Sequence, residues 1–160
     1  TSKAAVSGSF ADYSLSSTAA ANSIAEALKD VKMTIVPASV DSGLELRNQT
    51  IAEKYFAAFV PNTPFEVHVE SVSGDNKSGT ANLVVDINGS PKKLAFPYTV
   101  SPDGELIAKS TMEMMDFGLK AAFDSIHKAC ESLHMGADGV SKTWTDVELS
   151  VTAVIKKVCS

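Results

Sequence analysis

The sequence predicts a single, mainly β domain of about seven or eight antiparallel strands with one or two short helices. Apolar and polar residues alternate with period 2 over much of the chain, which is typical of strands with one buried and one exposed face. Turn sequences separate these runs, as in hairpins. The length of 160 residues fits one domain, residues 1–160, with one core.

Alternation is clearest in four runs, which cover residues 65–70, 81–88, 94–100 and 147–156. A fifth run, residues 106–115, keeps Leu106 and Met112 on one face and then changes phase beside Gly118. A change of phase next to glycine predicts a bulge or a sharp bend at the end of this strand.

Three turn sequences connect the predicted strands. Asn88-Gly89 is the dipeptide favoured in type I′ hairpins, because both positions tolerate a positive φ. Gly74-Asp75-Asn76 and residues 101–104 are turn sequences of similar quality. The resulting hairpins fit either a two-sheet sandwich or a closed barrel. A sandwich fills its interior, whereas an eight-stranded barrel leaves room for a slender ligand.

A helical period replaces the alternation in the segment that starts at Thr50. Thr50 and Glu53 have the spacing of a capping box, in which each side chain accepts a free N–H of the first turn. Tyr55 and Phe59 follow on one face, and Pro61 ends the pattern. We therefore expect a helix that begins at Thr50.

A second helix is predicted from about residue 121 to residue 134, with Gly136 as its stop. Its apolar stripe consists of Phe123, Ile126, Cys130 and Leu133. A shorter helical turn is expected at residues 23–29, where Ser23 and Glu26 have capping-box spacing.

The charge balance excludes two classes of partner. Lys and Arg total 14 against 19 Asp and Glu, which gives a net charge of −5. Nucleic acids and anionic membranes both require a basic surface, so we expect neither as a partner. Stable membrane insertion is not expected either, because the chain has no apolar run of about 18 residues.

The first residues and the cysteines bear on cellular location. The chain opens Thr1-Ser2-Lys3 without Met, which we interpret as a processed mature protein or an excised module. Cys130 and Cys159 fit one disulfide. Two reduced, buried thiols are the alternative, and the sequence leaves both open.

Catalytic and metal-binding motifs are weak. His127, Cys130 and His134 share one helical face, and Cys159 could complete a zinc site, but no second ligand pair has the short spacing of structural zinc sites. We therefore expect no metal. The chain has no Gly-x-Ser-x-Gly elbow, phosphate-binding loop or dinucleotide fingerprint, and we expect no enzyme.

Soft apolar residues are the most distinctive feature. Met112, Met114 and Met115 lie beside Phe117 in the sequence, and Tyr55 and Phe56 begin an aromatic-rich stretch. Such side chains adapt to flexible apolar ligands, but they also fill ordinary cores. Periodicity alone favours the core interpretation.

The order of several short motifs resembles the YceI-like family. Residues 39–43, Arg47-Asn48 and Tyr55-Phe56 are similar to its Ser-Val-x-(Thr/Ser)-Gly, Arg-(Asp/Asn) and Phe-Phe elements. Asp116-Phe117-Gly118 matches its Asp-Phe-Gly element. The remaining similarities are a hairpin at residues 79–94, a helix insertion around residues 128–134, and residues 142–147 before the last strand, so the resemblance covers residues 31–155.

This resemblance implies an extended, lipocalin-like antiparallel β-barrel, exported to the periplasm or secreted. Its apolar lumen would bind a long polyisoprenoid lipid, either a prenylated quinone such as ubiquinone or a polyprenyl phosphate. The role would be transport, storage or electron transfer, with no cofactor required. Arg47 matches an arginine of the family that is either structural or close to the barrel mouth.

The expected ligand-binding residues combine the inward strand positions with residues of the helical segments. Each buried CH₂ is worth about 0.8 kcal/mol, so a long tail needs no ionic anchor. The predicted set is Tyr55, Phe56, Phe65, Val67, Leu83, Val85, Ile87, Leu94, Phe96, Tyr98, Met112, Met114, Phe117, Phe123 and Leu149.

Two alternatives remain open at this point. The chain begins close to residues 7–10, which resemble the second strand of the family, so a second copy could supply the first strand in a homodimer. The alternative function is a carbohydrate-binding or structural β-sandwich. Trp144 is the only Trp, so the chain has few of the aromatic side chains that form a flat surface for stacking sugars.

Overall fold

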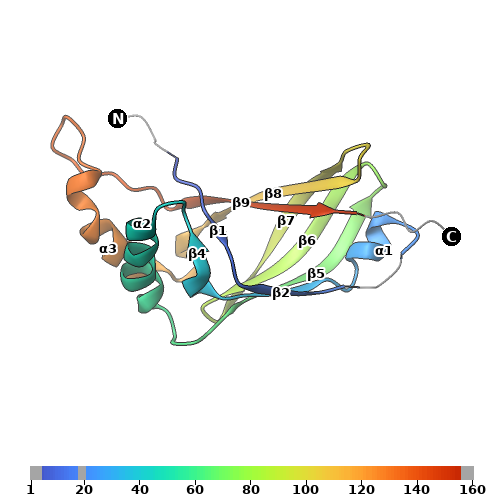
Figure 1. The fold of residues 1–160 in the computed structure, drawn as a ribbon, viewed down its shortest axis with the longest axis horizontal. Helices are drawn as coiled ribbons and strands as arrows, with labels where there is room; N and C mark the ends of the chain where they lie inside the picture. The colour runs from blue at the N-terminus through green and yellow to red at the C-terminus, as the bar shows by residue number, and fades with distance from the viewer. Residues whose placement is uncertain (1–4, 18–20, 156–160) are drawn as a thin grey trace.

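The computed structural model describes residues 5–17 and 21–155, and these residues form an antiparallel sheet curled into a half-barrel (Figure 1). Within this range the sheet has seven strands, in the order β2-β3-β5-β6-β7-β8-β9. Their bounds are β2 (Tyr13–Ser16), β3 (Lys32–Ile35), β5 (Phe65–Gly74), β6 (Ser78–Ile87), β7 (Ser90–Val100), β8 (Glu105–Glu113) and β9 (Asp146–Val154). The predicted mainly β, antiparallel class is confirmed.

A small two-stranded sheet lies beside the half-barrel. It consists of β1 (Ser9–Phe10) and β4 (Val40–Asp41), and Phe10 pairs with Val40. Over the described residues, the two outer strands of the large sheet are β2 and β9, which are not hydrogen-bonded neighbours. The sheet is therefore curled but is not closed by a ladder between these strands.

The predicted hairpins are present. Asn88 and Gly89 have φ values of 58° and 75° and form the two-residue turn between β6 and β7. The β5–β6 turn is held by Asp75, whose carboxylate accepts hydrogen bonds from the N–H groups of Lys77 and Ser78. These turns depend on local chemistry, which explains why the sequence predicts them well.

The helix predicted to begin at Thr50 begins earlier, and the proposed capping box is wrong. Helix α2 (Glu45–Thr50) continues into a π-helical turn, η2 (Ile51–Tyr55), and a 3₁₀ turn, η3 (Phe56–Ala58). Thr50 lies inside this helical segment, where its hydroxyl donates to the carbonyl of Leu46 at 2.9 Å. A threonine within a helix can bond backward in this way, so it did not mark a helix start.

The second predicted helix is shorter than expected. Helix α3 (Lys120–Ala129) ends five residues before the predicted end at residue 134, and a 3₁₀ turn, η5 (Glu131–Leu133), follows Cys130. Helix α1 (Ile24–Leu28) confirms the predicted short turn, because the Ser23 hydroxyl accepts a hydrogen bond from the N–H of Glu26 at 3.1 Å.

The phase change at the end of β8 is a sharp bend, as predicted, but the strand stops at Glu113 instead of Met115. The chain then forms a 3₁₀ turn, η4 (Met114–Phe117). Gly118 follows with a φ of 69°, in the left-handed region that glycine adopts without a steric penalty. The bend directs α3 across the end of the sheet.

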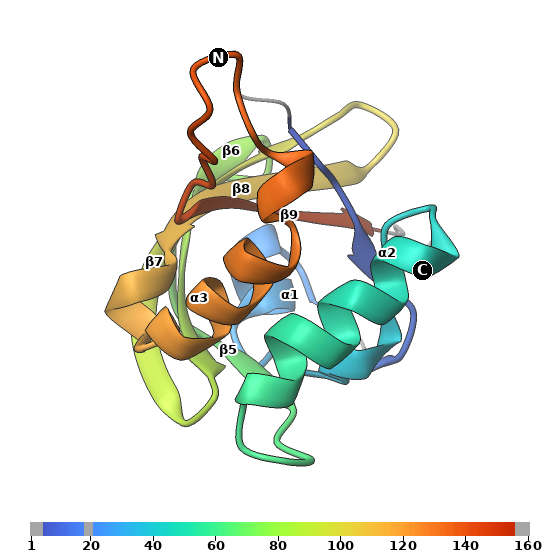
Figure 2. The same ribbon diagram turned by 90° about the vertical axis from the view of Figure 1, so that its left-hand side faces the viewer.

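Helical segments cover both ends of the half-barrel. The α2–η3 segment and α3 lie side by side across one end, which we call the helical end (Figure 2). At the opposite end lies α1, whose Ile24 is buried and donates its N–H to the Asn76 side chain at 2.9 Å (Figure 1). Among the described residues, no helix is long and apolar enough to span a bilayer.

Candidate functional site

The inner face of the sheet is apolar and brings together most of the predicted ligand-binding residues. Seven of them are buried, with exposed fractions between 2% and 8%: Phe65, Val85, Ile87, Phe96, Tyr98, Met112 and Phe117. Within the described ranges, no polar or charged residue is buried. The interior therefore offers dispersion contacts and almost no hydrogen-bonding groups.

A second set of predicted residues packs against this core but stays half-buried. It consists of Tyr55, Phe56, Val67, Leu83, Leu94, Met114 and Leu149. Val67, Leu83 and Leu149 share the inward phase of their strands, since Val67 pairs with Val85 and Val69 with Leu83. A filled core would bury these apolar side chains, so part of the inner face remains accessible.

Phe123 is half-buried on α3 and is not among the residues that pack against this core. Its ring stacks on His127 one turn further along α3, with centroids 5.8 Å apart and planes inclined by 9°. Aromatic residues four positions apart on a helix can contact each other without facing the core. The expected place of Phe123 at the lumen stays a prediction.

An aromatic cluster closes the helical end of the interior. Phe56 is the centre of this cluster, because its ring lies 5.2–6.2 Å from the rings of Tyr55, Phe59, Phe65 and Phe10. The cluster joins the helical cap to β5 and to β1. Phe10 and Phe59 were absent from the predicted site. Only the pairing of β1 with β4 brings Phe10 to this place, and no local sequence signal indicates it.

The Tyr55 hydroxyl links the helical cap to η4. It donates to the Met114 sulfur at 3.3 Å. Burial raises the pKa of Tyr55 to about 12, because the phenolate would lose its hydration. Tyr55 thus remains neutral at physiological pH and acts as a packing residue with one polar contact.

The sheet opens between β7 and β8. The two strands pair only through Tyr98–Ala108, Thr99–Ile107 and Val100–Leu106, although each has about ten residues. Towards the helical end, β7 remains paired with β6 and β8 with β9. Over the described strands, the sheet therefore divides here into one part that ends at β7 and another that begins at β8.

Pro97 explains where the separation begins. Val100 donates its N–H to Lys77 on the β6 side, and Ser101 donates to Glu105 on the β8 side. The backbone N–H groups of an antiparallel strand point alternately to its two neighbours, so an N–H at position 97 would point towards β8. Proline has no N–H, so the ladder cannot continue there with its usual bond.

A cleft of about 520 Å³ occupies this opening. Side chains from both faces of the sheet line it. The apolar part consists of Leu94, Met112 and Phe117, and the polar part of Lys92, Lys93, Thr111, Glu113, Asp116 and Asp146. Three residues predicted from the inward phase thus meet at the inner side of one cleft.

Some polar groups of the cleft already have partners. Glu113 accepts hydrogen bonds from the N–H of Met115 at 3.3 Å and from the Thr145 hydroxyl at 2.8 Å. Lys93 forms an ion pair with Glu70 on the outer face. Lys92 precedes Lys93 and therefore points to the other face of β7. Its partner on β6 is the buried Val85. Lys93 and Glu70 thus pair on the outer face, whereas Lys92 lies on the inward side.

The motif residues at the β4–α2 corner have structural roles. The Asn48 side-chain oxygen accepts from the N–H and the hydroxyl of Ser42, both at 2.7 Å. The Asp41 carboxylate accepts from the N–H of Gly43 at 2.8 Å, and this bond and Asn48 lower the pKa of Asp41. Arg47 lies on α2 at the helical end.

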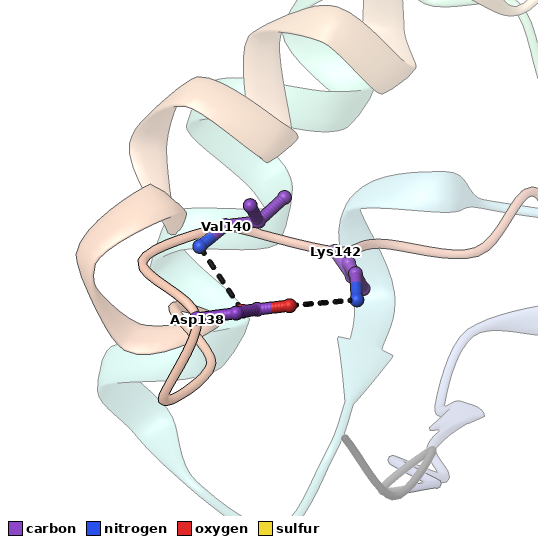
Figure 3. Close-up of polar contacts among 3 residues, drawn as sticks. All are labelled: Asp138, Val140 and Lys142. Carbon is purple, nitrogen blue, oxygen red and sulfur yellow. Dashed lines mark hydrogen bonds and ion pairs between the residues drawn. The ribbon is translucent and has the colours of Figure 1, made fainter.

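The chain between α3 and β9 forms a projecting loop. His127 and His134 both contact the Thr143 hydroxyl, at 2.8 and 3.2 Å. At the loop tip, the Asp138 carboxylate accepts from the N–H of Val140 and pairs with Lys142 at 3.1 Å (Figure 3).

The cysteine prediction stays open. Cys130 ends α3, at the helical end, and it is half-buried. Cys159 lies outside the described residues. The disulfide between the two residues, and equally the alternative of two reduced thiols, therefore stays a prediction.

Comparisons with solved structures agree with this architecture. The chain is similar to the YCEI protein of Campylobacter jejuni, at a TM-score of 0.65 and 20% identity, over 98% of this chain and 89% of that one. It is also similar to a polyisoprenoid binding domain from Saccharophagus degradans, at a TM-score of 0.57 and 12% identity, over 91% and 82% of the two chains. BcnA of Burkholderia cenocepacia matches at 0.56 and 19%, over 70% and 72%.

These identities are low, so the structural matches establish the fold. A search of curated proteins finds no significant match. The family comparison is more direct, because the YceI-like domain matches residues 1–155, nearly the whole chain. The curled antiparallel sheet, its apolar inner face and this match lead to one conclusion: the chain belongs to the YceI-like domain family.

Proposed function

We propose that this protein is a non-enzymatic binding module for a long polyisoprenoid lipid, either a prenylated quinone or a polyprenyl phosphate. The observation that carries the proposal is the continuous apolar inner face, of which Val67, Leu83 and Leu149 stay accessible. The family match and the similarity to a polyisoprenoid binding domain support it. Transport, storage and electron transfer are the roles that such binding would serve.

The physical basis is burial of the isoprenoid chain. Each CH₂ moved from water to the inner face contributes about 0.8 kcal/mol, so a tail of several isoprene units binds without a covalent or ionic anchor. Met112 and Met114 suit such a ligand, because the flexible thioether side chain adapts to an irregular tail. Among the buried side chains of the described residues, one carries a polar group, the Tyr98 hydroxyl, and it donates a hydrogen bond to the carbonyl of Asp75.

Location in the periplasm or outside the cell is part of the proposal. A net charge of −5 would keep a lipid-loaded carrier soluble and would not hold it to an anionic bilayer. A homodimer, in which a second copy contributes a strand, remains compatible with the unpaired outer edges of β2 and β9 in the described sheet.

Native mass spectrometry of freshly purified protein tests the proposal, because it reports ligand mass and oligomeric state together. We expect a bound species whose organic extract contains a prenyl lipid of unchanged chemistry. An extract without prenyl lipid, together with no uptake of added prenylated quinone or polyprenyl phosphate, would contradict it. Hydrolysis of an added lipid ester would identify an enzyme instead.

Two substitutions test whether the isoprenoid tail binds on the inner face of the sheet. Leu83→Asp places a charge on the accessible part of the inner face, and we expect it to abolish lipid uptake. The matched control is Val84→Asp, the next residue of β6, whose side chain lies on the outer face of the same strand. Equal loss of lipid in both variants would indicate unfolding, and circular dichroism would detect that loss of structure.

A further inference from the structure

The β7–β8 cleft offers a route into the interior from the side. The α2–η3 segment and α3 cover one end of the half-barrel, and α1 covers the other. Most polar side chains of the cleft lie on the outer side, whereas Leu94, Met112 and Phe117 lie on the inner side together with Lys92. An amphipathic lipid with a polar head and an apolar chain has the same order of polarity.

The separated edge of β7 supplies hydrogen-bond donors to this cleft. The alternation that points Pro97 towards β8 also points the N–H groups of Lys93 and Ala95 in that direction. The described part of β8 does not pair with either residue. Lys92 adds an ammonium group at the same level of the strand, on the inward side. Together these groups can donate to acceptor oxygens.

The charge of the cleft selects among polar heads. Two lysines and three carboxylates line it, which gives 2 − 3, or a formal charge of −1. A phosphate brings roughly −1.5 to −2 further charges at neutral pH and would be repelled by the carboxylates. A quinone head is neutral and carries two carbonyl acceptors, which match the backbone donors of β7 and the ammonium of Lys92.

From these observations we infer that the cleft between β7 and β8 is the entrance and the headgroup site of the lipid, and that it prefers a neutral, carbonyl-bearing head over a phosphate. The chain then passes Leu94, Met112 and Phe117 to reach the inner face. This inference rests on the proposed function and adds the position and the chemistry of head recognition.

The first test compares two lipids of equal chain length, a prenylated quinone and a polyprenyl phosphate, by equilibrium binding to the intact protein. The wild-type protein should bind the quinone more tightly. Tighter binding of the phosphate would overturn the headgroup inference but would leave the proposed function intact. Binding of neither lipid would overturn both.

The second test blocks the cleft. Thr111→Trp places a large ring on its lining, and Thr152→Trp is the matched control, an exposed position on the outer face of β9. We expect quinone uptake to slow at least tenfold in the first variant and to stay unchanged in the second. Equal uptake by both variants would place the entrance elsewhere while lipid binding itself persisted.

A milder pair of variants covers the case in which Thr111→Trp fails to fold. Lys92→Gln removes the inward ammonium group, and Lys109→Gln is the matched control, an exposed lysine on the outer face of β8 that does not line the cleft. Loss of one charged hydrogen bond should weaken quinone binding about tenfold in Lys92→Gln. Unchanged quinone binding in Lys92→Gln, or the same loss in Lys109→Gln, would overturn the inferred headgroup site.

Discussion

Tyr98 on β7 and Ala108 on β8 form the last pair between these two strands before the sheet opens. The Tyr98 ring lies against Gly79, where an added Cβ would come within 2.6 Å of its hydroxyl oxygen, and the hydroxyl donates to the carbonyl of Asp75 at 2.9 Å. One buried tyrosine therefore fixes the paired end of β7, and Pro97 begins the unpaired part.

Restoring the donor at position 97 should extend the ladder. We expect Pro97→Val to add a backbone bond from position 97 towards Lys109, because a residue with an N–H can occupy this ladder position. Hydrogen exchange should then show protection of the amide at position 97. An amide that exchanges as fast as one in an exposed loop would show that η4, and not proline, keeps the strands apart.

Truncation of Phe117 should leave a cavity next to the cleft. Phe117 is 2% exposed, whereas Met115 in the same turn is 38% exposed. Phe117→Ala should lower the free energy of unfolding by about 3–5 kcal/mol. Met115→Ala is the control and should change it far less. Urea unfolding measures both, and similar values for the two variants would contradict the buried position of Phe117.

Stability should fall at alkaline pH, and Tyr55 should account for part of the loss. Burial raises its pKa from 10.0 to about 12, so the folded state favours the protonated phenol. The resulting stabilisation is complete below pH 10 and is lost as pH rises from 10 to 12. Tyr55→Phe should reduce the fall in unfolding free energy between pH 9 and pH 11. An unchanged slope would show that Tyr55 is accessible.

Acid should weaken the β5–β6 turn. The N–H groups of Ser78 and Lys77 donate to Asp75 and lower its pKa below 3.8. A lowered folded-state pKa stabilises the protein above the ordinary value and ceases to do so as pH falls through the lowered value. Asp75→Ala should remove this part of the acid dependence, with Asp103→Ala in the neighbouring turn as the control. Acid titrations followed by circular dichroism measure both.

The projecting loop should depend on Thr143. Its hydroxyl contacts His127 and His134, so it ties the loop to α3. Thr143→Val keeps the shape and removes both contacts, which should cost about 1 kcal/mol per lost hydrogen bond and make residues 131–145 more sensitive to proteolysis. Thr152→Val, at an exposed position, is the control. Equal cleavage of wild type and Thr143→Val would contradict this role.

Predictions from local patterns succeeded where local chemistry sets the structure. The Asn88-Gly89 turn and the bend at Gly118 follow from backbone conformations that few other residues adopt. The helix start at Thr50 was wrong because capping-box spacing also occurs inside a helix. The alternation also predicted that Met112, Phe117 and Leu94 share an inward side, and the structure brings these three residues to one cleft.

The sequence by itself determined the antiparallel strands, their hairpins and the inward phase, because alternation and turn residues act over a few positions of the chain. It also determined the family, through the order of its motifs. Only the tertiary structure decided that β7 leaves β8 after Tyr98 and that Phe10 joins the aromatic cluster. Both depend on contacts between distant segments. Pro97 is visible in the sequence, but its effect depends on which neighbouring strand its missing N–H would have faced.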